Sequence, residues 1–383
     1  MPIISPRLRL RPSRKGASAF AQRSATVDRL SDWTAPFHNP GNLACRFYVP
    51  EGLTGPAPLI VVLHGCTQDA AVYDHGSGWS RLADRHGFIL LFPEQRRANN
   101  SMLCFNWFEA ADTTRGQGEA ASIRAMIDAV GAVHAIDRGR VFVTGLSAGG
   151  AMASVMLATY PEVFAGGAII AGVAYGCATS VAEAFSCMGG NVAAQGAGLG
   201  ARVRAASPHA GPWPRVQVWQ GSADRTVVSS NADAIVRQWL ELHRLPERPS
   251  RTEAVAGHAL RVWSGADGQP LVEQYDIAGM AHGIPLDPGT GAGQSGQAGA
   301  HMLDVGLSST DRIAEFFGVA NGAAATVGSS EVTKVQVAAK QIAPKQVFPK
   351  QVKAKKRASA APAAAHGVQK IIEDALKAAG LMR

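Results

Sequence analysis

The sequence lacks the features of several protein classes. Its five cysteines form no CxxC pair, and no histidine stands at zinc-ligand spacing from them, so we expect no structural metal site. It has no run of 18 apolar residues, so we expect no transmembrane helix. The odd number of cysteines leaves at least one thiol free. It is compatible with reduced thiols in the cytosol, or with one or two disulfides after export.

The N-terminus also lacks a recognisable secretory signal. Residues 1–30 contain seven Lys and Arg, but no apolar segment of 7–15 residues. This composition favours a cytoplasmic location over an extracellular one.

Lysine is absent from residues 31–330, where nineteen Arg face twenty-five Asp and Glu. The formal net charge of +8 therefore comes from the ends, because residues 331–383 hold eleven Lys and Arg against three acidic residues. We expect three parts: a flexible basic arm at 1–30, a folded body at 31–320, and a Lys/Ala/Pro-rich tail at 321–383. The basic pI then says nothing about the partners of the body.

The tail has a repeat of its own. The segments Lys340–Pro344 and Lys345–Pro349 share a five-residue period, which Lys350 begins again. Proline and like charge favour an extended, disordered chain, and only residues 368–380 have the spacing of a short amphipathic helix. Because Phe348 is the one aromatic residue of these repeats, stacking on single-stranded nucleic acid is not expected.

The body alternates short apolar runs with helical periodicity. The predicted strands are Leu59–Leu63, Phe88–Phe92, Arg140–Thr144, Gly167–Ala171, Arg215–Trp219 and Leu271–Ile277. Helices are predicted near 79–86, 119–133, 148–160, 231–242 and 313–319, with loops over 94–117 and 172–212. Continuous apolar strands are typical of a parallel sheet buried on both faces. The pattern predicts an α/β fold with a mostly parallel central sheet and helices on both faces.

The strongest chemical signal is Gly145-Leu146-Ser147-Ala148-Gly149, between a predicted strand and a predicted helix. This is the context of the nucleophile elbow in α/β-hydrolases, where a sharp turn presents a serine at a helix N-terminus. In a chain with 42 glycines a GxSxG alone could arise by chance, and the flanking strand and helix argue against chance. We therefore predict Ser147 as a nucleophile.

A serine nucleophile needs a base and an orienting carboxylate, which follow it in this fold in the order Asp, then His. Asp224 lies just beyond the Arg215–Trp219 strand, whereas its rival Asp233 lies inside a predicted helix. His282 follows the last predicted strand, a better position than those of His258 and His301. We predict Asp224 and His282 as the partners of the serine.

The oxyanion of an acyl-transfer intermediate is expected to bind two backbone N–H groups, those of Ala148 and of Cys66. Cys66 belongs to the turn after the first predicted central strand. His64 precedes it and is interpreted as structural rather than as a second base. Trp107, in the aromatic loop that follows the second central strand, either lines the substrate pocket or anchors the loop. Cys66 and Cys104 map near the pocket, and a bridge between them is possible.

Four ordered motifs make the body similar to the poly(3-hydroxybutyrate) depolymerase family of esterases, which is related to feruloyl and acetylxylan esterases. They are Leu63–Gln68, Cys104–Phe108, Thr144–Met152 and Tyr175–Ala178, within a resemblance that covers about residues 40–320. The resemblance implies the same catalytic residues and no cofactor. It adds Asn106 and Tyr175 to Trp107 as substrate-binding candidates.

The resemblance leaves the substrate and the location open. It implies cleavage of poly(3-hydroxybutyrate) or its oligomers, with feruloyl or acetylxylan ester hydrolysis as the alternative. Extracellular members of the family commonly carry a signal peptide and a substrate-binding domain, and this tail has no β-domain pattern. A third hypothesis is a noncatalytic protein that binds polyester granules or nucleic acid through the tail. The number of subunits is not predicted.

Overall fold

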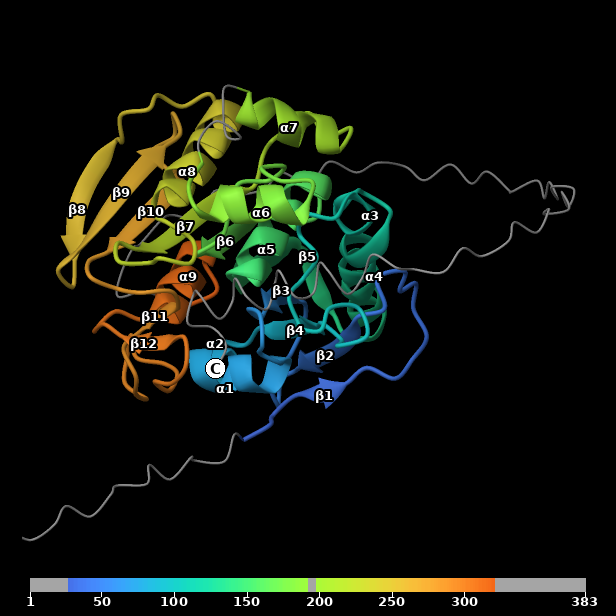
Figure 1. The fold of residues 1–383 in the computed structure, drawn as a ribbon. Coiled ribbons are helices and arrows are strands. Elements are labelled where there is room, and N and C mark those ends of the chain that lie inside the picture. The colour runs from blue at the N-terminus through green and yellow to red at the C-terminus, as the bar shows by residue number, and fades with distance from the viewer. Residues whose placement is uncertain (1–26, 192–197, 321–383) are drawn as a thin grey trace, which may run out of the picture.

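The computed structural model describes residues 27–191 and 198–320 (Figure 1). The expected arm up to residue 26 and the whole tail lie outside the described residues. The last residues assigned to the arm contact the body, because the Arg29 guanidinium donates to Ser80 and Asp84 and Leu30 is buried. No helix of the described part is long and apolar enough to cross a membrane.

One sheet of ten strands crosses the body in the order β1-β2-β4-β3-β5-β6-β7-β10-β9-β8. Its parallel centre consists of β4 (Ile89–Glu94), β3 (Ala57–Leu63), β5 (Ile136–Leu146), β6 (Gly166–Ile170), β7 (Arg215–Gly221) and β10 (Pro270–Ile277). The antiparallel edges are β1 (Ser31–Asp32) and β2 (Ala44–Tyr48) on one side, and β9 (His258–Ser264) and β8 (Arg251–Val255) on the other. A separate pair joins β11 (Ile284–Leu286) to β12 (Met302–Asp304).

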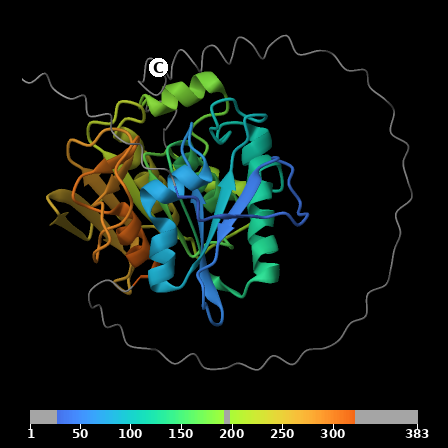
Figure 2. The same ribbon diagram turned by 90° about the horizontal axis from the view of Figure 1, so that it is seen from below.

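Helices cover both faces of the sheet (Figure 2). One face packs against α4 (Gly118–Val133), α5 (Ala148–Thr159), α7 (Leu199–Ala206) and α8 (Ser230–His243). The other packs against α1 (Ala70–Ser77), α2 (Trp79–His86) and α9 (Ser309–Phe317). Successive residues of β3 alternate between the two hydrophobic clusters, as the two-residue period of a strand requires. The predicted layered α/β architecture is confirmed.

The structure adds elements that the periodicity did not indicate. Short helices α3 (Ala110–Thr113) and α6 (Val181–Met188), together with α7, lie in segments predicted as loops. The strand β8 was missed because four of its five residues are exposed, so it has no apolar alternation. Two disulfides, Cys66–Cys104 and Cys177–Cys187, brace the loops, and Cys45 is a buried free thiol.

Candidate active site

Ser147 occupies the sharp turn between β5 and α5. Its backbone has φ +57° and ψ −117°, a conformation that non-glycine residues rarely adopt. The turn is held by a hydrogen bond from the Ser147 N–H to the Ile170 carbonyl, 2.9 Å. A Cβ at position 149 would lie 2.3 Å from the Leu63 carbonyl oxygen, so glycine is required for the helix to approach β3. The serine therefore stands at the positive end of the α5 dipole.

Asp224 is buried in the loop after β7, where its carboxylate accepts four hydrogen bonds. The N–H groups of Thr226 and Val227 donate to Oδ1 at 2.8 and 2.9 Å. The Gln220 side chain donates to Oδ2 at 3.1 Å, and His282 Nδ1 lies 2.7 Å from the same oxygen. An acceptor of this kind fixes the proton of the imidazole on Nδ1 and leaves Nε2 with a lone pair.

His282 and Ser147 line one narrow pocket of about 20 Å³. The pocket is lined by Gly65, Cys66, Thr67, Gln68, Leu146, Ser147, His282 and His301. The volume is enough for little more than one water-sized group. Two of the three predicted catalytic residues, Ser147 and His282, thus line one pocket. The third, Asp224, is hydrogen-bonded to the imidazole of His282.

His301 had been considered only as a rival base, and the structure places it in the same pocket. Its Nδ1 donates to the His282 carbonyl at 3.1 Å, and the two imidazole rings lie 6.0 Å apart. The backbone of His301 has a φ of +58°. Nothing in the local sequence indicates this contact, because it depends on the loop that leads into β12.

Cys66 and Ala148, the two predicted oxyanion donors, belong to the turn after β3 and to the start of α5. Among the described residues, the Cys66 N–H has no hydrogen-bond acceptor, and Cys66 lines the pocket. Ala148 is the first residue of α5, so its N–H has no acceptor within the helix. Both amides are therefore available to a bound anion.

His64 is enclosed instead of facing the pocket. Its Nε2 accepts the Gln95 N–H at 3.1 Å, and its Nδ1 lies 2.8 Å from the Gly65 carbonyl, to which it donates. Burial lowers the pKa of His64 to about 4, so the ring is neutral near pH 7. Both ring nitrogens are engaged within the fold, as expected of a structural histidine.

Two of the three substrate-binding candidates share a groove, and the third does not line it. Trp107 and Tyr175 line a second groove of about 310 Å³, which also includes Phe108 and Arg202. Asn106 takes part in loop contacts instead: its side chain donates to Asp112 at 3.1 Å and accepts from the Asn100 amide at 3.1 Å. Among the described residues, no cluster of three or more His, Cys, Asp or Glu could hold a metal ion.

Comparisons with known proteins agree with this architecture. Residues 43–254 match the family model described as esterase PHB depolymerase. The chain is 49% identical over 301 residues to poly(3-hydroxyalkanoate) depolymerase C of Paucimonas lemoignei, covering 78% of this chain and 72% of the relative. It is 32% identical over 257 residues to an acetylxylan esterase of Coprinopsis cinerea, covering 65% and 67%.

A solved acetyl xylan esterase from Aspergillus awamori superposes with a TM-score of 0.63 at 26% identity, over 76% of this chain and 99% of that one. Together with the sheet order, this likeness establishes the α/β-hydrolase fold. The chain is an ester hydrolase, and it belongs to the PHB depolymerase family of esterases.

Proposed function

We propose that this esterase cleaves the ester bonds of poly(3-hydroxyalkanoate) chains or oligomers with Ser147 as nucleophile, His282 as general base and Asp224 as the orienting carboxylate. The observation that carries the proposal is the 2.7 Å hydrogen bond between His282 and Asp224, behind a pocket shared by His282 and Ser147. A serine hydroxyl is a weak nucleophile unless an adjacent base accepts its proton.

The first half of the reaction transfers the acyl group to the enzyme. His282 Nε2 takes the proton as Ser147 Oγ attacks the ester carbonyl, and the carbonyl oxygen becomes an anion. The N–H groups of Cys66 and Ala148 stabilise this anion. The tetrahedral intermediate then collapses, the C–O bond to the alcohol breaks, and His282 returns the proton to the leaving alkoxide.

The second half releases the acid. Water gives a proton to His282 as it attacks the acyl-enzyme, a second tetrahedral anion forms, and Ser147 leaves with the proton from His282. Asp224 stays ionised throughout and stabilises the imidazolium form of His282. No step requires a metal ion or an organic cofactor.

The small volume of the pocket supports a substrate that lies across its mouth, with only the carbonyl oxygen of the reacting ester inside. The groove lined by Trp107 and Tyr175 offers a separate surface with aromatic side chains for more distant units of the chain. The 49% identity to a poly(3-hydroxyalkanoate) depolymerase favours a polyester over a xylan ester, since the acetylxylan esterase relative shares 32%. The fungal relatives keep acetylxylan as the second candidate substrate.

The nucleophile is tested by Ser147→Ala. We expect a folded protein whose hydrolysis of p-nitrophenyl butyrate falls by about 10⁴ or more, since removing a triad member leaves only anion binding and substrate binding. Near-normal turnover by this variant would falsify the assignment.

The substrate is tested by measuring product release from polyhydroxybutyrate film, acetylated xylan and methyl ferulate in parallel. Faster release from xylan than from film would favour the second candidate.

A further inference from the structure

A loop far from Ser147 in sequence is tied to the turn that carries the proposed oxyanion donor. We call residues 95–106 the bridging loop and residues 64–68 the oxyanion turn. The Cys66–Cys104 disulfide joins them, and the Thr67 N–H donates to the Met102 carbonyl at 2.7 Å. The position of the Cys66 amide therefore depends on where the bridging loop is held.

The backbone at this junction is strained on both sides. Thr67 has φ +65° and Leu103 has φ +56°, a region that is unfavourable for residues with a Cβ and most unfavourable for a β-branched residue such as threonine. Strained residues persist only where their surroundings impose the conformation. The oxyanion turn thus needs support from outside itself.

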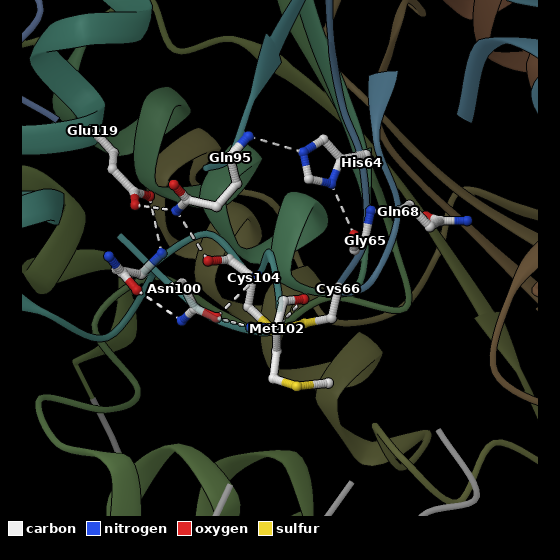
Figure 3. Close-up of a disulfide and its surroundings, with 10 residues drawn as sticks. His64, Gly65, Cys66, Gln68, Gln95, Asn100, Met102, Cys104 and Glu119 are labelled. Atoms are coloured by element: carbon white, nitrogen blue, oxygen red, sulfur yellow. Dashed lines mark hydrogen bonds between the residues drawn. A yellow bond between two sulfur atoms is a disulfide. The ribbon is translucent and has the colours of Figure 1, made fainter. Parts of the chain in front are cut away.

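Glu119, near the start of α4, supplies that support (Figure 3). Its side chain is buried, and it accepts a hydrogen bond from each end of the bridging loop. The Gln95 Nε2 donates to Oε1 at 2.5 Å, and the Asn106 N–H donates to Oε2 at 2.9 Å. The same Gln95 amide donates to the Cys104 carbonyl at 3.0 Å, directly at the disulfide.

The rest of the bridging loop is built around these contacts. Gln95 Oε1 accepts from the Arg96 N–H and from the Asn99 amide, which fixes Gln95 Nε2 toward Glu119. The side-chain oxygen of Asn100, Oδ1, accepts hydrogen bonds from the N–H groups of Met102 and Cys104. The loop is therefore a hydrogen-bonded unit, and the Glu119 carboxyl is the group that joins it to α4.

We propose that Glu119 is a positioning residue for ester hydrolysis, which holds the bridging loop so that the Cys66 N–H points at the oxyanion. The inference rests on the proposed role of Cys66. A buried carboxyl costs free energy that a leucine at this helix position would avoid, so its place in the fold is explained by the donors that it holds.

The test is Glu119→Gln, which keeps the size of the side chain. Assays are run at pH 9, where the Glu119 carboxyl is ionised and both of its oxygens accept, because its pKa is raised to about 8. A glutamine can accept from only one of the two donors, and its own NH₂ group would face the other. We expect kcat on p-nitrophenyl butyrate to fall by about ten- to hundredfold, with KM within about twofold, because the amide stabilises the transition state and not the bound ester. Affinity for phenylboronic acid, a tetrahedral mimic bound through the serine, is expected to fall in parallel.

A matched control variant separates positioning from general destabilisation. The matched control is Glu273→Gln. Glu273 is also a buried carboxyl that accepts a hydrogen bond from a glutamine, Gln217, at 2.7 Å. It lies on β10 and lines a groove that contains none of the catalytic candidates. The kcat of this variant is expected to match that of the unmodified protein.

Unchanged kcat and boronate affinity in Glu119→Gln would overturn the positioning role. So would a fall in kcat that Glu273→Gln shares. These results leave the Ser147 assignment intact, whereas an active Ser147→Ala variant would remove the proposed function itself. The two failures are therefore distinguishable within one set of proteins.

Discussion

Asp224 and Asp233 have the same chemistry in different surroundings. Asp224 is buried and accepts four hydrogen bonds, one of them from His282. Asp233, on α8, has a side chain that is 54% exposed and pairs with Arg261 at 3.2 Å. Only the first carboxylate can fix the orientation of the imidazole.

Asp224→Asn is therefore expected to lower kcat by about 10³–10⁴, because an amide at this position favours the wrong tautomer of His282. Asp233→Asn is expected to leave kcat within about twofold. Steady-state kinetics on p-nitrophenyl butyrate, with circular dichroism to check folding, measure both. The reverse order of effects would mean that another carboxylate serves His282.

Glu119 also makes the stability of the fold depend on pH. Burial, together with the negative charge of the nearby Asp112, raises the pKa of its carboxyl to about 8 from an ordinary value of 4.5. A raised pKa means that the folded state binds the proton more tightly than the unfolded chain does. The stabilising contribution is present below about pH 4.5 and is lost as pH rises through about 8.

Glu119→Gln removes this titration. We expect the Tm of the variant, relative to the unmodified protein, to rise steadily between pH 5 and pH 8.5 in thermal melts. The exposed Glu109→Gln, which changes no buried group, is the control and is expected to show a constant difference. A Tm difference for Glu119→Gln that does not change with pH would show that the carboxyl does not titrate differently in the folded state.

At the scale of elements, the two disulfides brace different parts of the fold. Cys66–Cys104 spans 38 residues and fastens the oxyanion turn, whereas Cys177–Cys187 spans 10 residues beside α6. Chain-entropy estimates assign about 4 kcal/mol of stability to the longer loop and about 3 kcal/mol to the shorter one. The two bridges are thus similar in stability and differ in what they hold.

We expect Cys104→Ser to lower kcat by about tenfold or more, measured below the Tm, since the Cys66 amide loses one of its two anchors. The double variant Cys177→Ser with Cys187→Ser is expected to lose a comparable amount of stability and to keep its kcat. Urea unfolding and kinetics on the same preparations provide the comparison. Equal loss of kcat in the two variants would mean that the effect is general loosening.

The strands and helices also differ in how well the sequence predicts them. The strands β3, β5 and β7 were found because parallel strands buried on both faces are continuous apolar runs, and the strand ends then located Ser147 and Asp224. β8 was missed because it is an antiparallel edge strand with four of its five residues exposed. Glu119 was missed because an acidic residue on a helix is usually solvated, and only the folded loop around it shows that it is buried.

At the scale of the whole molecule, the described body contains every residue of the proposed chemistry. α9 ends at Phe317 and is capped by Gly318, close to the boundary that the sequence predicts at residue 320. The two disulfides are typical of proteins that fold in an oxidising compartment, and they weigh against the cytoplasmic location that the N-terminal composition favours. We therefore expect the tail, with eleven Lys and Arg in residues 331–383, to take no part in the reaction.

We propose that this tail attaches the esterase to an apolar or anionic polymer surface such as a polyester granule, against the alternative that it has no role. Deleting residues 325–383 is expected to leave kcat on p-nitrophenyl butyrate within about twofold, because no catalytic candidate lies there. Adsorption to polyhydroxybutyrate particles is expected to weaken, and most strongly at low salt, where attraction between the cationic tail and the surface is least screened. Sedimentation of particles with the full chain and the truncated chain over a salt series measures this. Equal adsorption at every salt concentration would leave the tail as an appendage without a docking role, and would assign surface binding to the body itself.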